Sequence, residues 1–176
     1  MTSASEYLNQ IEAELGNSWL PHLYRERVLK IRTRAYQFPA PAGSVAVEIY
    51  HTLLGIELKA GRRRMLCPDL ATARYLAVFA RLACQNVAIP YDITKISLVA
   101  DELESSWHRM LLISDRLTTS RGKAFQTRIR RQIIAKVRNE VNQAGAGPRV
   151  PEFKQHTKQR TSPTKAPKRA KDDLEL

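Results

Sequence analysis

Apolar residues recur at helical spacing along much of the chain, and this spacing predicts its helices. Leu8, Ile11 and Leu15 place one apolar face on a first helix, which Gly16 ends. The other stretches with this spacing predict helices over residues 20–36, 70–84, 94–117 and 122–142. The segment 70–84 is apolar on most sides, so we expect it to be buried between other elements.

Alternating apolar and polar positions between residues 44 and 67 predict strands. Val45, Val47 and Ile49 alternate in this way, and a hairpin-like pair is the preferred interpretation of residues 53–67. A helix over 45–55 followed by a short strand is an alternative for the same residues. Further along the chain, residues 87–91 predict a short buried strand.

Together these elements predict an α/β or α+β fold, with one small sheet and flanking helices. The sheet is expected to contain residues 45–67 and 87–91. Between residues 62 and 117 the order is strand, helix, strand, helix. A connection of this length favours parallel strands joined by a right-handed crossover. Residues 1–143 are expected to form a single globular domain.

The chain changes character at residue 144. A run of small residues and proline begins there, and apolar residues are nearly absent beyond it. Residues 148–171 hold eight Lys and Arg against one acid, Glu152. Because this segment cannot bury enough surface to offset the entropy of ordering it, 144–176 is predicted to be a disordered basic tail. The acidic last residues of the chain have no assigned role.

The composition narrows the class of protein. With 176 residues, 43% of them hydrophobic and 26% charged, the chain is typical of a soluble globular protein. No apolar run approaches the roughly 18–20 residues of a membrane span, and the acidic N-terminal segment does not fit a signal peptide. Two cysteines, Cys67 and Cys84, are too few for a disulfide framework, so a cytoplasmic location is expected.

Positive charge is the feature that points most directly to function. There are 29 Lys and Arg against 17 Asp and Glu, a net charge of +12, and the excess is concentrated in four blocks. Clustered cations are typical of proteins that bind DNA or RNA, because cations near phosphates release condensed counterions. An acidic protein partner, a charged surface kept for solubility and a membrane surface are alternatives. The residues expected to contact phosphates are Arg32, Arg34, Arg62, Arg63, Arg64, Arg121, Arg128, Arg131 and Arg138.

Aromatic residues near these arginines are candidate stacking platforms for single strands. Tyr24, Tyr36 and Phe38 alternate with basic residues, although a place in the core is the preferred interpretation for them. Trp19 and Trp107 occupy apolar helical positions and are expected to be packing residues.

Few patterns indicate metal, nucleotide or hydrolase chemistry. The four histidines are scattered, the two cysteines are seventeen residues apart, and no Walker, GxGxxG or GxSxG motif occurs. We therefore expect no metal and no cofactor, and we expect Cys84 to be a small core residue.

One arrangement of charged residues could carry chemistry. Glu48 precedes the triplet Glu57-Leu58-Lys59, and this pattern resembles part of the PD-(D/E)xK nuclease family. That resemblance implies that Glu48 and Glu57 hold Mg²⁺ and that Lys59 orients the attacking water. The chain departs from the family pattern because its first acid is Glu48 rather than Asp, and because no Pro-Asp pair precedes the triplet.

Three functions thus follow from the sequence. The preferred one is a non-enzymatic nucleic-acid-binding protein, with DNA and RNA both open. A metal-dependent nuclease using Glu48, Glu57 and Lys59 is the first alternative. An interaction or assembly factor that binds an acidic protein is the second.

Overall fold

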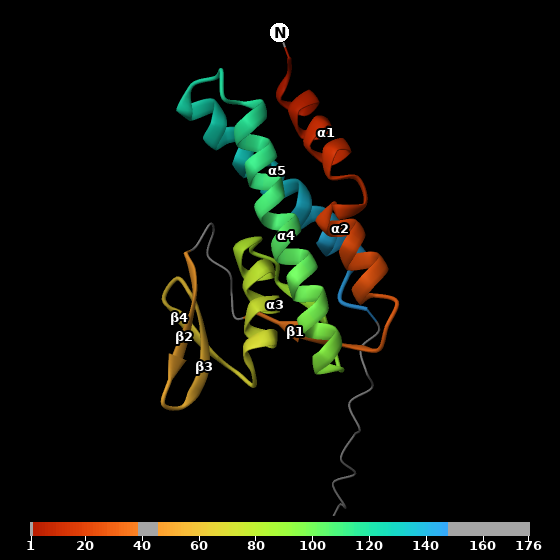
Figure 1. Ribbon diagram of the computed structural model, residues 1–176, viewed down its shortest axis with the longest axis vertical. Coiled ribbons are helices and arrows are strands. Elements are labelled where there is room, and N and C mark those ends of the chain that lie inside the picture. The colour runs from red at the N-terminus through yellow and green to blue at the C-terminus, as the bar shows by residue number, and fades with distance from the viewer. Residues whose placement is uncertain (1, 39–45, 148–176) are drawn as a thin grey trace, which may run out of the picture.

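The computed structural model describes residues 2–38 and 46–147, which form a mixed α/β body (Figure 1). Along the chain its longer helices are α1 (Ala4–Leu15), α3 (Leu70–Arg81), α4 (Ile93–Leu117) and α5 (Lys123–Ala144). A short α2 (Leu20–Leu23) runs directly into a π-helical turn, Tyr24–Val28. The strands are β1 (Thr33–Gln37), β2 (Val47–Thr52), β3 (Gly55–Ala60), β4 (Arg63–Cys67) and β5 (Asn86–Pro90). The predicted fold class is confirmed.

The strands form two antiparallel sheets, and the predicted single sheet with parallel strands is wrong. β2, β3 and β4 make a three-stranded meander, while β1 pairs with β5 alone. β4 and β5, which were expected to lie parallel in one sheet, therefore belong to different sheets. The partner of β5 comes from a segment that the sequence predicted as the end of a helix.

The predicted helix over 20–36 is correct only in its first half. Its helical conformation ends at Val28, and the chain then turns and becomes extended over Thr33–Gln37. A β-branched threonine starts this strand, and Phe38 after it precedes a proline, which disfavours helical geometry. Pairing with β5, whose Val87 and Ile89 are completely buried, then stabilises the strand.

The meander replaces both interpretations of residues 44–67. Residues 47–52 are a strand, so the alternative helix over 45–55 is wrong there, and the predicted hairpin is the second half of the meander. A two-residue connection, Gly61-Arg62, joins β3 to β4, since Ala60 pairs with Arg63. Gly61 has φ 62°, the positive value that such tight hairpins need at their first position.

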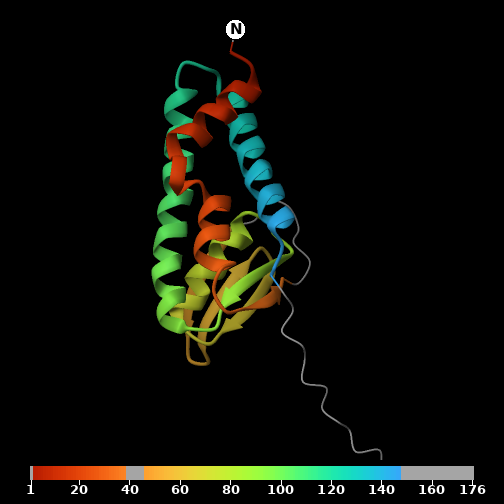
Figure 2. The ribbon, with the colours of Figure 1, turned by 90° about the vertical axis from the view of Figure 1, so that its right-hand side faces the viewer.

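Figure 2 shows α4 running along the length of the molecule, with α5 alongside it toward the end that holds the N-terminus. α1 lies across α4 and α5, and the two sheets lie toward the opposite end (Figure 2). The α5 residues that recur every fourth position face inward and are completely buried: Ile129, Ile133, Val137 and Val141. The stripe predicted for this helix is therefore its packing face.

Several other sequence predictions are confirmed by burial. Trp19, Trp107, Tyr24, Phe38 and Cys84 are all buried. Tyr24 and Phe38 thus belong to the core, as the preferred interpretation held. No helix in the described part of the chain is long and apolar enough to cross a membrane.

The described body continues past residue 143, where the sequence placed the end of the domain. α5 ends at Ala144, and the Gly145 carbonyl accepts a 2.5 Å hydrogen bond from the Tyr24 hydroxyl. A Cβ on Gly147 would lie 3.3 Å from the Thr33 hydroxyl oxygen, so this residue is in close contact with β1. The rest of the predicted tail, 148–176, lies outside the described residues.

Candidate nucleic-acid interface

Charge pairing within the body is strongly unequal between acids and bases. Residues 2–38 and 46–147 contain 13 Asp and Glu, and every one of them has a hydrogen-bond or ion-pair partner. The same residues contain 21 Lys and Arg, of which only seven pair with a carboxylate. The other 14 Lys and Arg have no carboxylate partner among the described residues.

The β3–β4 hairpin presents two of these bases side by side. Arg62 occupies the tight connection and Arg63 opens β4, and both side chains are exposed. The backbone beneath them is well held, because Gly61 N–H donates to the Ala46 carbonyl at 3.2 Å. Neither arginine has a carboxylate partner among the described residues. The hairpin therefore holds two cationic side chains out into solvent on a fixed backbone.

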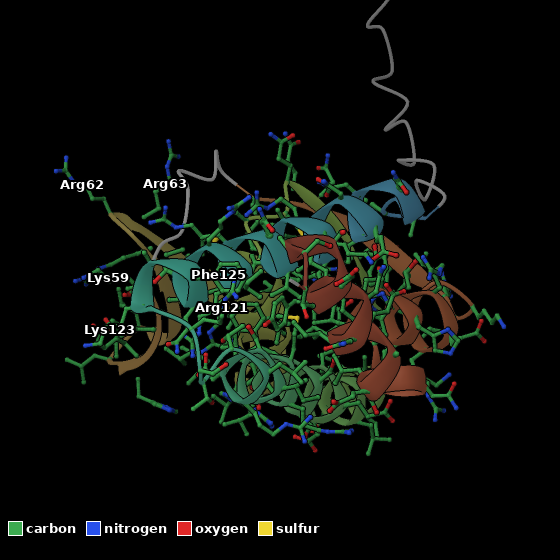
Figure 3. The ribbon with its side chains drawn as sticks, turned by 90° about the horizontal axis from the view of Figure 1, so that it is seen from above. Lys59, Arg62, Arg63, Arg121, Lys123 and Phe125 are labelled. Atoms are coloured by element: carbon green, nitrogen blue, oxygen red, sulfur yellow. The ribbon has the colours of Figure 1, made fainter. Side chains whose placement is uncertain are left out.

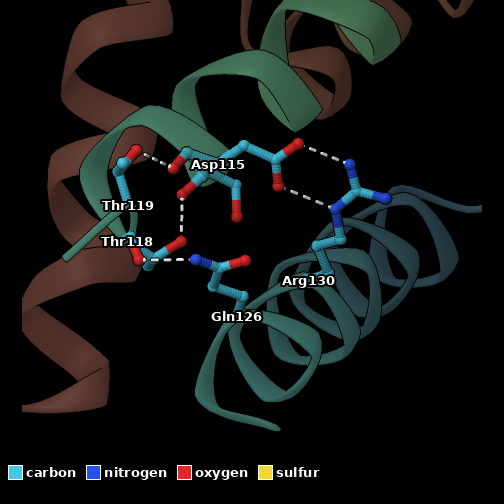
Figure 4. Close-up of polar contacts among 6 residues, drawn as sticks. Asp115, Thr118, Thr119, Gln126 and Arg130 are labelled. Atoms are coloured by element: carbon cyan, nitrogen blue, oxygen red, sulfur yellow. Dashed lines mark hydrogen bonds and ion pairs between the residues drawn. The ribbon is translucent and has the colours of Figure 1, made fainter. Parts of the chain in front are cut away.

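A second group of bases lies where α4 turns into α5, and Figure 4 shows what holds this turn. Asp115 of α4 accepts two hydrogen bonds from Arg130 of α5, at 2.9 and 2.6 Å. The Gln126 side-chain amide donates to the Thr118 and Arg121 carbonyls at 2.9 and 3.1 Å. These bonds fix the turn that carries Arg121 and Lys123.

Arg121 is positioned further by an aromatic ring. Its guanidinium carbon lies 4.3 Å from the centroid of the Phe125 ring, close enough for a cation–π contact. Lys123, at the first position of α5, is exposed. A stacked arginine keeps its planar hydrogen-bonding edge available, and this edge matches the oxygens of a phosphate.

The two groups project from the same long side of the molecule. Seen down the long axis, Lys59, Arg62 and Lys123 reach the left edge of the molecule and Arg63 points to its upper left, while Arg121 lies further in, beside Phe125 (Figure 3). Figure 1 agrees, since both the meander and the turn lie at its left, although at different heights along the long axis. We call these five residues the basic flank.

Four of the nine predicted phosphate-contacting arginines are placed differently. Arg32 and Arg34 belong to the β1 region, in the other sheet, and Arg32 stacks on Tyr91 at 4.9 Å. Arg64 lies 3.7 Å from the Glu57 carboxylate. Arg138 is half-buried and donates from Nε to the Leu82 carbonyl at 2.5 Å.

Arg138 was predicted to lie with Arg128 and Arg131 on an exposed face, and for Arg138 this is wrong. The carbonyls at the end of α3 lack partners within their own helix, and the Arg138 side chain satisfies one of them. Arg128 and Arg131 are exposed, as predicted, and have no carboxylate partner within the described part of α5's surroundings. Together with Lys123 they are bases of α5 that have no carboxylate partner among the described residues.

Several residues at these surfaces were not predicted as contact residues from the sequence. Lys59 and Lys123 belong to the basic flank but stood outside the predicted set of arginines. Tyr50 and Tyr91 are 39% and 43% exposed, whereas the aromatic residues considered as platforms are buried or half-buried. The exposure of Tyr50 could have been predicted from the alternation of side chains in β2, which places Tyr50 on the face opposite Val47 and Ile49.

The three residues of the nuclease resemblance share one face of the meander. Glu48 pairs across the strands with Lys59, and Glu57 pairs with Tyr50. Glu48 accepts a hydrogen bond from the Tyr50 hydroxyl, and Glu57 lies 3.7 Å from Arg64, although its buried Oε2 has no hydrogen-bond partner among the described residues. Within residues 2–38 and 46–147, no three His, Cys, Asp or Glu side chains gather closely enough to hold a metal ion.

Comparison with known proteins found no relative of this chain. The chain matches no protein-family model, no curated protein and no solved structure. Its function is therefore argued from its own residues.

Proposed function

We propose that the protein binds nucleic acid without acting on it, through phosphate contacts made by the basic flank and by the free arginines of α5. The observation that carries this proposal is the unequal pairing of charge. Each of the 13 carboxylates of the described residues has a hydrogen-bond or ion-pair partner inside the body, while Arg62, Arg63 and Lys123 are exposed and pair with no carboxylate there.

Phosphates suit these side chains for two physical reasons. Arginine donates two parallel hydrogen bonds to phosphate oxygens, and each neutralised phosphate releases counterions. The separation of the two groups along one side of the molecule also suits a long polyanion better than a single small anion. Such contacts strengthen binding without reading the sequence of bases.

The composition of the chain beyond residue 147 supports the same proposal. Residues 148–176 contain eight Lys and Arg against four Asp and Glu, so they add positive charge next to that of the body. A cytoplasmic location, predicted from the low number of cysteines, would place the protein where RNA is abundant. Both remain sequence-based predictions.

Salt dependence tests the proposal. In the variant R62A/R63A, the affinity for a labelled nucleic acid should fall for every base sequence alike. The slope of log affinity against log salt should decrease by about one to two units, because two phosphate contacts are lost. Fluorescence anisotropy at several salt concentrations measures both quantities.

A matched control removes the same charge elsewhere. Arg25 and Lys30 are exposed and lie in and just after the π-helical turn that follows α2, on the other long side in Figure 1. Among the residues that the structure describes, Arg25 pairs with no carboxylate, and Lys30 makes one exposed ion pair, with Glu26, which contributes little to stability. R25A/K30A should keep the slope of the wild type. An equal loss in both variants would refute a localised interface, and no binding at low salt would favour an acidic protein partner.

The nuclease alternative makes a separate prediction. Because the carboxylates of Glu48 and Glu57 are engaged by Tyr50 and Arg64, neither Mg²⁺ nor Mn²⁺ should induce cleavage of DNA or RNA. Gel analysis of labelled substrates checks this. Cleavage that requires the divalent ion and disappears in Glu57→Ala, with an unchanged melting temperature, would overturn the non-enzymatic proposal. Cleavage that persists in Glu57→Ala would indicate a contaminating nuclease.

A further inference from the structure

The outer face of the meander combines apolar and cationic side chains in an ordered way. Two rows of three residues cross its strands, and the registers place Glu48, Lys59 and Arg64 in one row. The next row holds Tyr50, Glu57 and Leu66. The opposite face carries Leu58, which is completely buried and packs toward α3. The two rows therefore form a surface that the core does not use.

The apolar members of this face are more exposed than their chemistry favours. Tyr50 is 39% exposed and Leu66 65% exposed, and they flank Glu57 in the same row. The β2–β3 connection continues the apolar surface with Leu53 and Leu54, both largely exposed. Exposed apolar residues that gather in one place, with polar residues around them, typically mark a binding surface.

Cations border this apolar area on the side of the β3–β4 hairpin. Lys59 and Arg64 lie in the neighbouring row, together with the exposed carboxylate of Glu48, which accepts from the Tyr50 hydroxyl. Arg62 lies in the connection beyond this row, whereas Arg63 pairs with Ala60 and belongs to the opposite face. The Arg64 guanidinium carbon lies 6.0 Å from the Tyr50 ring centroid and 3.7 Å from Glu57, so it connects the two rows. Glu57 is paired with this arginine, and its side chain is only 17% exposed. Little negative charge is thus presented from the apolar row.

We infer that the outer face of the meander is a platform for single-stranded nucleic acid, with Tyr50 stacking on a base and Lys59 and Arg62 holding adjacent phosphates. A single strand offers flat apolar bases beside its phosphates, which matches an aromatic row next to a cationic one. A duplex keeps its bases stacked inside and presents mainly phosphate at its surface. This inference rests on the proposed function and names the class of nucleic acid it concerns.

The test compares a single strand with a duplex of the same sequence. The probes are fluorescein-labelled, non-self-pairing DNA strands of roughly 16 nucleotides, alone and annealed to a complement, with the full chain at one salt concentration. The wild type should bind the single strand more tightly. Tyr50→Ala should weaken single-strand binding about fivefold or more, the loss typical of one stacked base. Its duplex affinity and its salt slope should not change.

Three further variants make the result specific to the ring. Tyr50→Phe keeps the ring and should bind like the wild type, while Tyr50→Leu keeps an apolar side chain without a ring and should bind like Tyr50→Ala. Tyr91→Ala is the matched control, because Tyr91 is 43% exposed and stacks with Arg32 but lies at the end of the other sheet. It should bind like the wild type. Ultraviolet crosslinking and mass spectrometry should place the crosslink on Tyr50.

Each contrary outcome has a distinct meaning. Wild-type single-strand affinity in both Tyr50→Ala and Tyr50→Leu would refute the platform, and so would an equal loss in Tyr91→Ala. If the duplex binds as tightly as the single strand and Arg62 and Arg63 still matter, the platform is wrong and the proposed function stands. If neither probe binds at low salt, both are wrong.

Discussion

Replacing Ile133 with aspartate is expected to cost about 3–5 kcal/mol of folding free energy. Ile133 is completely buried in the middle of α5, on the face that contacts α1, α2, α4 and β5. An aspartate there would bury a carboxylate with no cation to pair with it, or would become protonated at a similar cost. Because one face of α5 supports so much of the body, the loss should be global and cooperative.

Thermal and urea unfolding followed by circular dichroism measure this loss. Asn139→Asp is the matched control, since Asn139 is an exposed residue of the same helix and receives the same charge. It should change the free energy of unfolding by less than about 0.5 kcal/mol. Equal stability of Ile133→Asp and the wild type would show that α5 does not pack on the body through this face.

Removing a single hydroxyl, in Tyr24→Phe, should cost about 2–4 kcal/mol. Tyr24 is completely buried in the π-helical turn, and its hydroxyl serves two distant parts of the chain. It donates to the Gly145 carbonyl at 2.5 Å and accepts from the Ala88 N–H of β5 at 3.0 Å. Burial raises the pKa of Tyr24 to about 12, so the hydroxyl keeps its proton at physiological pH. Phenylalanine would leave a buried amide and a carbonyl without their partner.

Tyr7→Phe separates this effect from the loss of a hydroxyl as such. Tyr7 is also buried and packs edge-on against Phe125, at 5.4 Å between ring centroids, a contact that phenylalanine preserves. No hydrogen bond of its hydroxyl occurs among the described residues, so its removal should cost less than about 1 kcal/mol. Hydrogen exchange should also show faster exchange of the Ala88 amide in Tyr24→Phe alone. An equal stability change in both variants would contradict the bridging role of Tyr24.

The helices were predictable because their signal is local. Residues three and four apart share a helix face. The spacing of Ile129, Ile133 and Val137 therefore predicts the buried face of α5 without information from any other segment. The predicted ends of α3, α4 and α5 lie within a few residues of the observed ones for the same reason. The meander was recognised in part, because alternation is also local, but the number and pairing of its strands were not.

The pairing of β1 with β5 could not be predicted from local pattern. Its residues are about fifty positions apart, and Thr33–Gln37 continue an apolar spacing that also fits a helix. The extended form becomes more favourable only because the backbone groups of the buried β5 need hydrogen-bond partners. Because β5 pairs with β1, it does not lie in one sheet with β4, as the order of elements along the chain had predicted.

For the candidate site, the sign of the charge, the blocks in which it is concentrated and the helix faces that carry it all follow from the order of residues along the chain. Tertiary structure alone decided which bases are free. Glu57 pairs with Arg64, Asp115 with Arg130 and the Leu82 carbonyl with Arg138, while Arg62 and Arg63 have no such partner among the described residues. The spacing of apolar residues reflects contacts within one or two helical turns, so it can be recognised in the sequence. The counter-charge of an arginine, like the partner of a strand, comes from distant residues that only folding brings together.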